Sequence, residues 1–355
     1  MRISLIVTRR IKPLPRWTAP VLSFIIGTLL AIALLYVLTG GRADPLVILA
    51  SIGRALASPN LLLKNFALLT IVGIGLLISF KAAVFNIGGE GQFYFAIIAA
   101  TWVALYSGLG TILIINKLAM LILGIVLAGV WALIAAAPRG YLGVDEVPVT
   151  LLMNYIAYYI VDYLVFGPWR EPVYKYARTS TIPVESWFIH IPGTTATIEL
   201  LVLMVVVIIG AWYLLRNTRL GLMISVMGSN PHVLRVVGVR PEQIVVAALV
   251  ISGMVIGFAG VSYLAGEAHL ITIPAEERTP MLGYTGILVA WLSMLEIVYI
   301  PVAAYIVSAL INAGINIQIA GAGGASVVDV FIGTILLMYS IFVILTEYRV
   351  RLVIK

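Results

Sequence analysis

The sequence contains no cysteine and only three histidines, and just 10% of its 355 residues are charged. Without cysteine, the chain can form neither a disulfide framework nor a thiolate metal site. The histidines, His190, His232 and His269, are far apart, so they indicate no metal site and no paired base and nucleophile of an intramembrane enzyme. A soluble domain normally carries about 25% charged residues. So small a charged fraction excludes an ordinary water-soluble domain.

What the sequence has instead is apolar residues, which make up 62% of the chain. In lipid, a helix satisfies its own backbone hydrogen bonds, so helical spans are the structure that this composition favours. The net charge of +7 could indicate nucleic-acid binding. The basic residues cluster between apolar runs, however, which is typical of cytoplasmic loops, and we expect no nucleic-acid partner.

Because a bilayer core requires about 20 apolar residues per helix, the hydrophobic runs predict transmembrane helices. The first run, from Trp17 to Leu38, is too long for the apolar region of a signal peptide. The fold class is therefore an all-α integral membrane protein with about ten transmembrane helices. The segment 46–58 is too short to span and is expected along the surface. The predicted spans are 17–39, 62–80, 92–107, 112–136, 147–166, 197–215, 244–265, 281–295, 298–318 and 326–346.

Ten spans would place both termini on one side of the membrane. With the termini inside, most of the 22 lysines and arginines fall in inner segments, although the outer loop 167–196 carries Arg170, Lys175 and Arg178. Positive charge prefers the cytoplasmic side. We therefore predict a multi-pass protein of a prokaryotic cell membrane with cytoplasmic termini, organised as a single transmembrane domain over residues 1–355.

Glycines and polar side chains interrupt the apolar pattern between Phe85 and Gln92. Asn86, Glu90 and Gln92 lie at or near membrane depth, where irregular backbone is tolerated if it is buried in protein or lines a cavity. An ionisable residue in such a place is a functional candidate. The alternative is a solvent-exposed turn between two helices.

A second polar cluster begins at Asp145 and extends to Asn154 and Tyr155. Asp145 is suited to cap a helix, and Glu146 then favours the positive end of that helix. Helix initiation explains these two residues but leaves Asn154 unexplained, because Asn154 falls about two turns into the predicted span. Its amide requires a partner from another helix or from a substrate.

The third cluster lies in the loop 216–243. Asn230 is a good N-cap, Pro231 suits the first helical position and Gly238 suits a left-handed helix end. The pattern predicts a helix over 231–237, too short to cross a membrane, with Val233, Leu234 and Val237 on one side. This helix either docks on a partner protein or lies on lipid headgroups.

Four segments together resemble the branched-chain-type permease superfamily of ATP-binding-cassette (ABC) importers, which includes simple-sugar and nucleoside permeases. The resemblance runs from about Asn65 to Leu345, and its first two segments together lean toward the nucleoside branch. The four segments are Asn86–Gln92 (N-I-G-G-E-G-Q), Gly143–Ile156 (G-V-D-E-V…L-L-M-N-Y-I), Gly228–Gly238 (G-S-N-P…R…G) and Thr279–Ile287 (T-P-M-L-G-Y-T-G-I).

The resemblance implies a membrane-spanning permease subunit that carries a small polar solute, a nucleoside or a simple sugar. Its implied partners are ABC ATPase subunits, a second permease subunit (identical or homologous), an extracellular substrate-binding protein and membrane lipid. We expect the translocation pathway to include Asn86, Glu90, Gln92, Asn154 and Tyr155. We expect coupling to the ATPase through Gly228, Ser229, Asn230, Pro231, Arg235 and Gly238.

The sequence contains no phosphate-binding G-x-x-x-x-G-K-[ST] loop, and it has no lysine between Lys175 and Lys355. We therefore expect no enzymatic activity and no cofactor in this chain, with ATP used by the partner ATPase. The alternative is a secondary transporter driven by an ion gradient, which requires intramembrane carboxylates. The candidates for that role are Glu90, Asp162, Glu267, Glu296 and Asp329.

Overall fold

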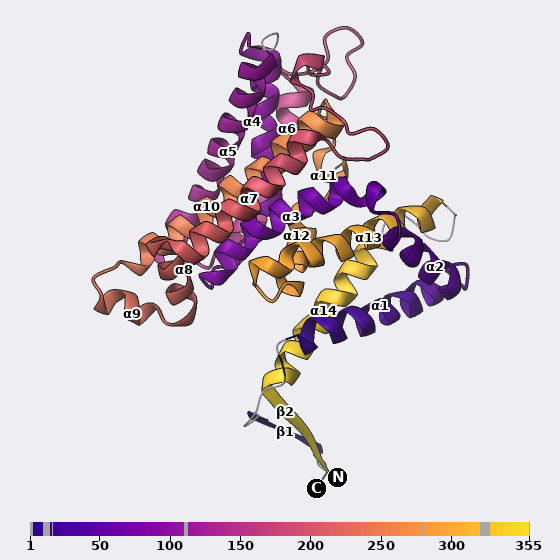
Figure 1. Cartoon of the computed structure of the whole chain (residues 1–355), viewed down its shortest axis with the longest axis vertical. Helices are drawn as coiled ribbons and strands as arrows, with labels where there is room; N and C mark the ends of the chain where they lie inside the picture. The colour runs from indigo at the N-terminus through magenta and orange to yellow at the C-terminus, as the bar shows by residue number, and fades with distance from the viewer. Residues whose placement is uncertain are drawn as a thin grey trace. The chain divides into compact units, whose positions relative to one another are not determined.

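The computed structural model describes residues 3–9, 15, 17–109, 113–278, 280–319 and 327–354, and helices make up most of this length (Figure 1). Contacts between residues divide the chain into two compact units. The first unit comprises Met1–Leu62 together with Trp291–Lys355, and the second comprises Leu63–Ala290. This division does not test the expectation of a single permease domain over residues 1–355, which stays a prediction.

The first unit is built from two helix pairs. Helix α1 (Thr18–Leu38) packs along α14 (Val327–Glu347), and Gly27 permits close approach, since a Cβ there would stand 2.7 Å from the Ile335 backbone. Helix α2 (Pro45–Leu56) packs on α13 (Ile300–Ile319). The segment expected along the surface is therefore a helix with one buried face, which includes Ile48 and Ile52.

Two strands also belong to the first unit, and the sequence pattern did not predict them. Strand β1 (Ile3–Arg9) pairs antiparallel with β2 (Tyr348–Ile354), with Ile3 opposite Ile354 and Arg9 opposite Tyr348. Both segments are rich in β-branched residues, which suit a strand. Their pairing brings the two ends of the described chain together (Figure 1).

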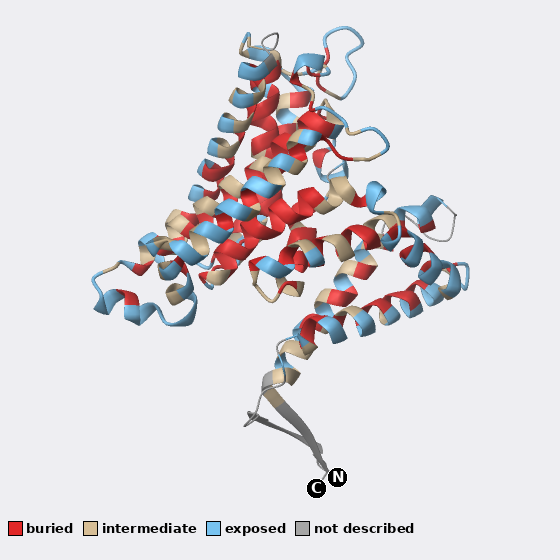
Figure 2. Cartoon of the chain, viewed as in Figure 1, coloured by how far each residue is buried: buried red, intermediate tan, exposed pale blue. Residues whose placement is uncertain are grey.

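The second unit is entirely helical apart from its loops and isolated bridges. Helix α10 packs against α4 and α5, and α4 also packs against α6. Small residues allow these contacts: a Cβ on Gly257 would stand 2.9 Å from the Ile125 backbone. The resulting core is buried (Figure 2). Its helices are α3 (Pro59–Lys81, beginning in the first unit), α4 (Gly89–Tyr106), α5 (Leu113–Ala137), α6 (Glu146–Phe166), α7 (Ile198–Asn217), α8 (Arg219–Ser229), α9 (Pro231–Val236), α10 (Pro241–Tyr263), α11 (Ala275–Arg278) and α12 (Leu282–Leu292, ending in the first unit).

Four short helical turns complete the described secondary structure. A π-turn over Pro138–Leu142 extends α5, and another over Leu264–Ala268 extends α10. Single 3₁₀ turns occupy Val184–Ser186 and Ile297–Tyr299.

The predicted helical membrane architecture is confirmed. Within the described residues, eight helices are long and apolar enough to cross a membrane. The two remaining predicted spans correspond to α4, which has 18 residues, and α12, which has 11. Helix α12 is too short to cross a bilayer core alone, since 11 residues extend only about 17 Å.

Candidate functional site

The amino-terminal ends of α4 and α12 meet around Glu90. The carboxylate is fully buried, and its Oε2 accepts a hydrogen bond from the Gly283 N–H at 2.6 Å. Gly283 lies so close that a Cβ there would collide with the Glu90 backbone. Because helix amino termini carry partial positive charge, a carboxylate is stabilised in this position. The solvent-exposed turn considered for this segment is therefore wrong.

The side-chain amides of Asn86, just before α4, and Gln92, in its first turn, form two reciprocal hydrogen bonds. Asn86 Nδ2 donates to Gln92 Oε1 at 3.0 Å, and Gln92 Nε2 donates to Asn86 Oδ1 at 3.1 Å. Asn86 Nδ2 also donates to Ser252 Oγ on α10 at 3.0 Å, and Asn86 Oδ1 accepts the Gly88 N–H. Asn86 is fully buried and Gln92 is 2% exposed. This pair fixes the loop before α4 to α10.

Asn154 connects α6 to the same loop. Its Oδ1 accepts the Gly91 N–H at 2.8 Å, and its Nδ2 donates to Ile87 O at 3.0 Å and to Tyr284 Oη at 2.9 Å. The hydrogen-bond partners expected for this amide therefore come from other segments of the chain. Each of these bonds joins residues at least 63 positions apart, so Asn154 joins three segments that are remote in sequence.

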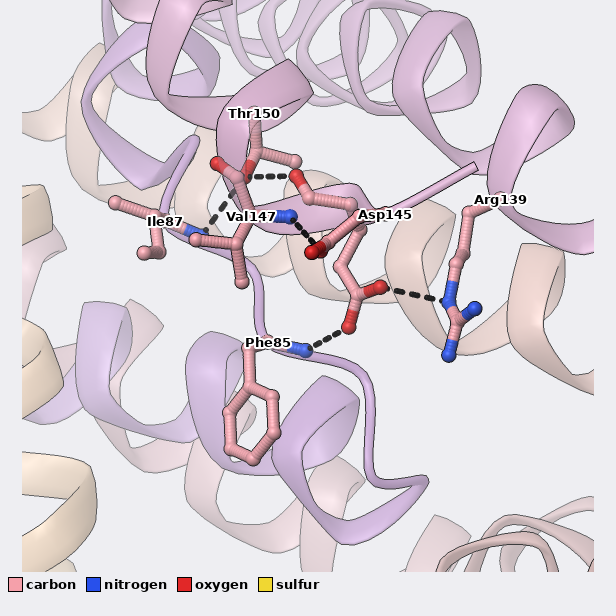
Figure 3. A network of polar contacts seen from close by, with 7 residues as sticks. Phe85, Ile87, Arg139, Asp145, Val147 and Thr150 are labelled. Carbon is pink, nitrogen blue, oxygen red and sulfur yellow. Dashed lines mark hydrogen bonds and ion pairs between the residues drawn. The ribbon is translucent and has the colours of Figure 1, made fainter. Parts of the chain in front are cut away.

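Glu146 ties the beginning of α6 to the loop that precedes Asn86 (Figure 3). Its Oε1 accepts the Phe85 N–H at 2.8 Å, and its Oε2 forms an ion pair with Arg139 Nε at 2.6 Å. Asp145 caps the helix by accepting the Val147 N–H, as predicted. Glu146 does more than initiate the helix, because its side chain is only 5% exposed and bridges two segments.

We name Asn86, Glu90, Gln92, Glu146 and Asn154 the buried network. Sequence reasoning had found four of these residues as candidates for the translocation pathway, and the structure places those four together. The fifth pathway candidate, Tyr155, lies outside the network and is 39% exposed. In this conformation the network residues join helix ends, and their place on the pathway stays a prediction.

Sequence reasoning missed three partners of the buried network: Arg139, Ser252 and Tyr284. Tyr284 falls in Thr279–Ile287, the fourth segment of the family resemblance. That position was the one signal in the sequence that could have pointed to Tyr284. The first residue of that segment, Thr279, lies outside the described residues.

Helix α9 has the local structure that its sequence predicts. Asn230 accepts the His232 N–H at 3.1 Å as the N-cap, and Pro231 takes the first helical position. Gly238 has a left-handed φ of 78°, and the Val239 N–H donates to Leu234 O at 2.8 Å to close the end. The helix ends at Val236, one residue before the predicted end.

The exposed surface of α9 differs from the prediction. Leu234 is 2% exposed and points inward, so Val233, Leu234 and Val237 do not share one face. The outward surface instead carries Val236, 87% exposed, and Val237, 66% exposed. Arg235 is largely exposed and forms a 3.4 Å ion pair with Glu242. We name Val233, Arg235, Val236 and Val237 the α9 surface.

The segment before α9 touches the region of the buried network. Gly228, near the end of α8, packs directly on the backbone of Lys81 and Ala83, where a Cβ would collide with Lys81 O. The loop from Ala82 to Gly88 then leads to Asn86. The coupling segment and the network loop are therefore in backbone contact.

Three of the carboxylates considered for ion coupling interact with donors of the second unit, to which they themselves belong. Glu90 accepts from Gly283, Asp162 accepts the Ala275 N–H at 2.8 Å, and Glu267 pairs with Lys64 at 2.5 Å. No group of three or more histidine, aspartate or glutamate residues able to hold a metal ion occurs in the described part of the chain.

Two cavities of the second unit are small. One of about 50 Å³ is lined by residues that include Tyr94, Tyr263 and Arg278, and another, beside Lys64 and Glu267, has about 10 Å³. Pockets for small molecules usually have about 300–1,000 Å³. A cavity of about 350 Å³ lies in the first unit, but side chains such as Trp17, Phe24 and Val302 make it apolar. None of these three cavities offers a polar solute an enclosed site of its own size.

Comparison with known proteins gives a consistent result. Residues 59–340 match the family model for the permease component of the branched-chain amino acid transport system. Relatives include a glucose ABC transporter permease of Haloferax volcanii, 24% identical over 79% of this chain and 76% of that protein, and a guanosine ABC transporter permease of Bacillus subtilis, 25% identical over 79% of each. A nucleoside ABC transporter permease of Lactococcus lactis is 24% identical over 82% of this chain and 81% of that protein. No solved structure matches.

Proposed function

As a member of the family of branched-chain-type permease components, the chain is a membrane-spanning permease subunit of an ABC importer, and we propose that its solute is a nucleoside or a simple sugar. The observation that carries the choice of solute is the set of relatives, whose names specify glucose, guanosine and nucleosides. The resemblance of residues 86–92 and 143–156 to nucleoside-type permeases favours the nucleoside.

The energy for transport comes, in this proposal, from ATPase subunits that dock on the α9 surface. The helix is fixed by Asn230 and Gly238, and it presents exposed valines beside Arg235. Exposed apolar side chains around a charged group suit a protein groove better than water. The exposed valines favour a partner other than water, and the family resemblance of residues 228–238 favours docking over a helix that touches only lipid headgroups.

The other partners complete an importer. A second permease subunit shares the membrane region, and an extracellular binding protein delivers the solute. We place both termini in the cytoplasm, on the same side as α9. The pairing of β1 with β2 supports a common side for the two ends of the chain.

A transport assay tests the proposal. The chain would be reconstituted in vesicles with its ATPase subunits and binding protein, and uptake of guanosine and glucose would be measured with ATP while ionophores collapse all ion gradients. We expect ATP-dependent uptake of one of the two solutes. Uptake that needs an ion gradient and proceeds without ATP would refute the importer in favour of a secondary transporter.

A further inference from the structure

Three tyrosines form an exposed stripe along α6. Tyr155, Tyr159 and Tyr163 follow one another at intervals of four residues, so they lie on one side of the helix. They are 39%, 66% and 73% exposed. Tyr159 is the fourteenth of the 21 residues of α6 and lies about 20 Å from its start, well inside the span. We name these residues the tyrosine stripe.

Two other helices of the second unit, α5 and α7, expose a different chemistry along their middles. The exposed positions in the middle of α7 are aliphatic, with Val202, Val206 and Ile209 among them, and its exposed Trp212 and Tyr213 occur in the last third of the helix. The middle of α5 exposes Ile122, Val126 and Val130. Aliphatic faces with aromatic residues at the ends are typical of helices in contact with lipid.

A tyrosine hydroxyl in the middle of a lipid-facing surface has no hydrogen-bond partner, because acyl chains offer none. Tyrosine therefore prefers positions where its ring meets apolar surface and its hydroxyl meets water. Two mid-span tyrosines and a third one turn further on indicate that this side of α6 faces a polar medium within the membrane.

An aromatic residue on the buried side of α6 packs against the stripe. Tyr158, on the buried side of α6, packs edge-on against Tyr155 with ring centroids 6.1 Å apart, and against Tyr94 at 5.4 Å. One turn before Tyr158, Asn154 belongs to the buried network through its bonds to Gly91 and Tyr284. The stripe thus lies on the exposed side of the helix whose buried side fixes the network.

We propose that the tyrosine stripe lines the translocation pathway and stacks on a ring face of the solute, with its hydroxyls turned to water and to the polar groups of that solute. This inference rests on the proposed function and extends the pathway from Tyr155 to Tyr159 and Tyr163. The chemical class is a nucleobase or a sugar ring, because both combine a face that stacks with an edge that hydrogen-bonds.

The absence of native cysteine makes a labelling experiment direct. Tyr159→Cys would be prepared in the full importer complex, with Val206→Cys on α7 and Val126→Cys on α5 as matched controls from the exposed middle of their helices. A water-soluble, membrane-impermeant thiol reagent would be added, and labelling of this chain would be followed over time. We expect Tyr159→Cys to react at least about tenfold faster than either control, since thiolate forms readily in water and poorly in an apolar medium.

Protection of Tyr159→Cys from labelling by an added solute shows which class of ring the stripe binds. We expect guanosine, glucose or both to slow the labelling of Tyr159→Cys while leaving the controls unchanged, and the effective solute gives the class. Equal labelling rates at all three positions would overturn the proposal and make the stripe a lipid-facing surface. Labelling of Tyr159→Cys that is slow in the assembled importer and becomes fast once the second permease subunit is removed would also overturn it and make the stripe a subunit interface.

Uptake by substituted complexes provides the second readout. Replacing Tyr159 by leucine removes the hydroxyl and the stacking face, so we expect KM for the transported solute to rise about tenfold. Tyr159→Phe keeps the ring and should lose much less, and Tyr213→Leu on α7 is the matched control with no expected effect. An unchanged KM for Tyr159→Leu would contradict the stacking role. Labelling requires no ATP, so it separates this inference from a failure of the importer itself.

Discussion

The segments 86–92 and 228–238 resemble each other in residue composition but differ in burial. Both interrupt apolar runs with glycines and polar residues, and both carry the family resemblance. The first is buried. Its polar side chains bond to residues of α4, α10 and α12, and its backbone bonds to the Asn154 side chain of α6. The second presents Arg235, Val236 and Val237 outward. A polar, glycine-containing interruption therefore marks a special place in a membrane helix bundle without saying whether it serves packing or a partner.

Physical chemistry explains why the two environments should respond differently to mutation. A buried polar group that loses its partner costs about 1–3 kcal/mol, and more if it is charged. An exposed group loses little, because water replaces the partner. Substitutions in the buried network should therefore act on stability, and substitutions on the α9 surface should act on coupling.

The largest effect is expected at Gly283. A Cβ there collides with the Glu90 backbone, which cannot move aside as a flexible side chain could. Gly283→Ala should lower the stability of the chain by about 3 kcal/mol or more, because α4 and α12 must separate. Thermal unfolding in detergent would measure the loss. Gly210→Ala on α7, where a Cβ meets open space, is the control and should be neutral or slightly stabilising.

The next effect concerns Glu146. Glu146→Ala removes the acceptor for the Phe85 N–H and the partner of Arg139, and should cost about 2 kcal/mol. Glu146→Gln keeps an oxygen for Phe85 and loses only the ion pair, which is weakened by the partial exposure of Arg139, so it should cost less than half as much. Equal unfolding temperatures for Glu146→Ala and the unsubstituted chain would show that the tether is unimportant.

On the α9 surface, Arg235→Glu should leave stability unchanged and uncouple transport. It reverses an exposed charge and puts a second carboxylate beside that of Glu242. We expect ATP-driven uptake to fall at least about tenfold, equivalent to about 1.4 kcal/mol. Arg54→Glu, a charge reversal on the exposed side of α2, is the control and should transport normally. Full uptake by the Arg235→Glu complex would remove Arg235 from the coupling residues.

The smallest effect is expected for Glu242→Lys. Its pairing with Arg235 spans 3.4 Å between two solvent-accessible groups, so the pair contributes about 0–1 kcal/mol. Uptake should change by less than about twofold. A loss as large as that of Arg235→Glu would mean that the ion pair, rather than the outward charge of α9, matters for coupling.

Local signals in the sequence predicted the helices and the caps well. Most predicted spans end within about three residues of the observed helices, because a 20-residue apolar run has few alternatives to a spanning helix. Asn230, Pro231 and Gly238 fixed the short helix in the same way, since capping depends on residues only two to four positions apart.

Tertiary contacts were beyond the reach of these local patterns. Asn154 was recognised as needing a partner, but Tyr284 lies 130 positions away. The inward turn of Leu234 depends on packing against the rest of the unit, and the pairing of β1 with β2 joins opposite ends of the chain. Each of these features is decided by which segments meet in space.

The most direct test of the coupling role is crosslinking from the α9 surface. The chain has no native cysteine, so Val236→Cys can carry a photo-activated crosslinker in the assembled importer, with Val126→Cys on α5 as the control. The account predicts a crosslink from position 236 to an ATPase subunit and none from position 126. A crosslink from position 236 to lipid alone would contradict it and return α9 to the membrane surface.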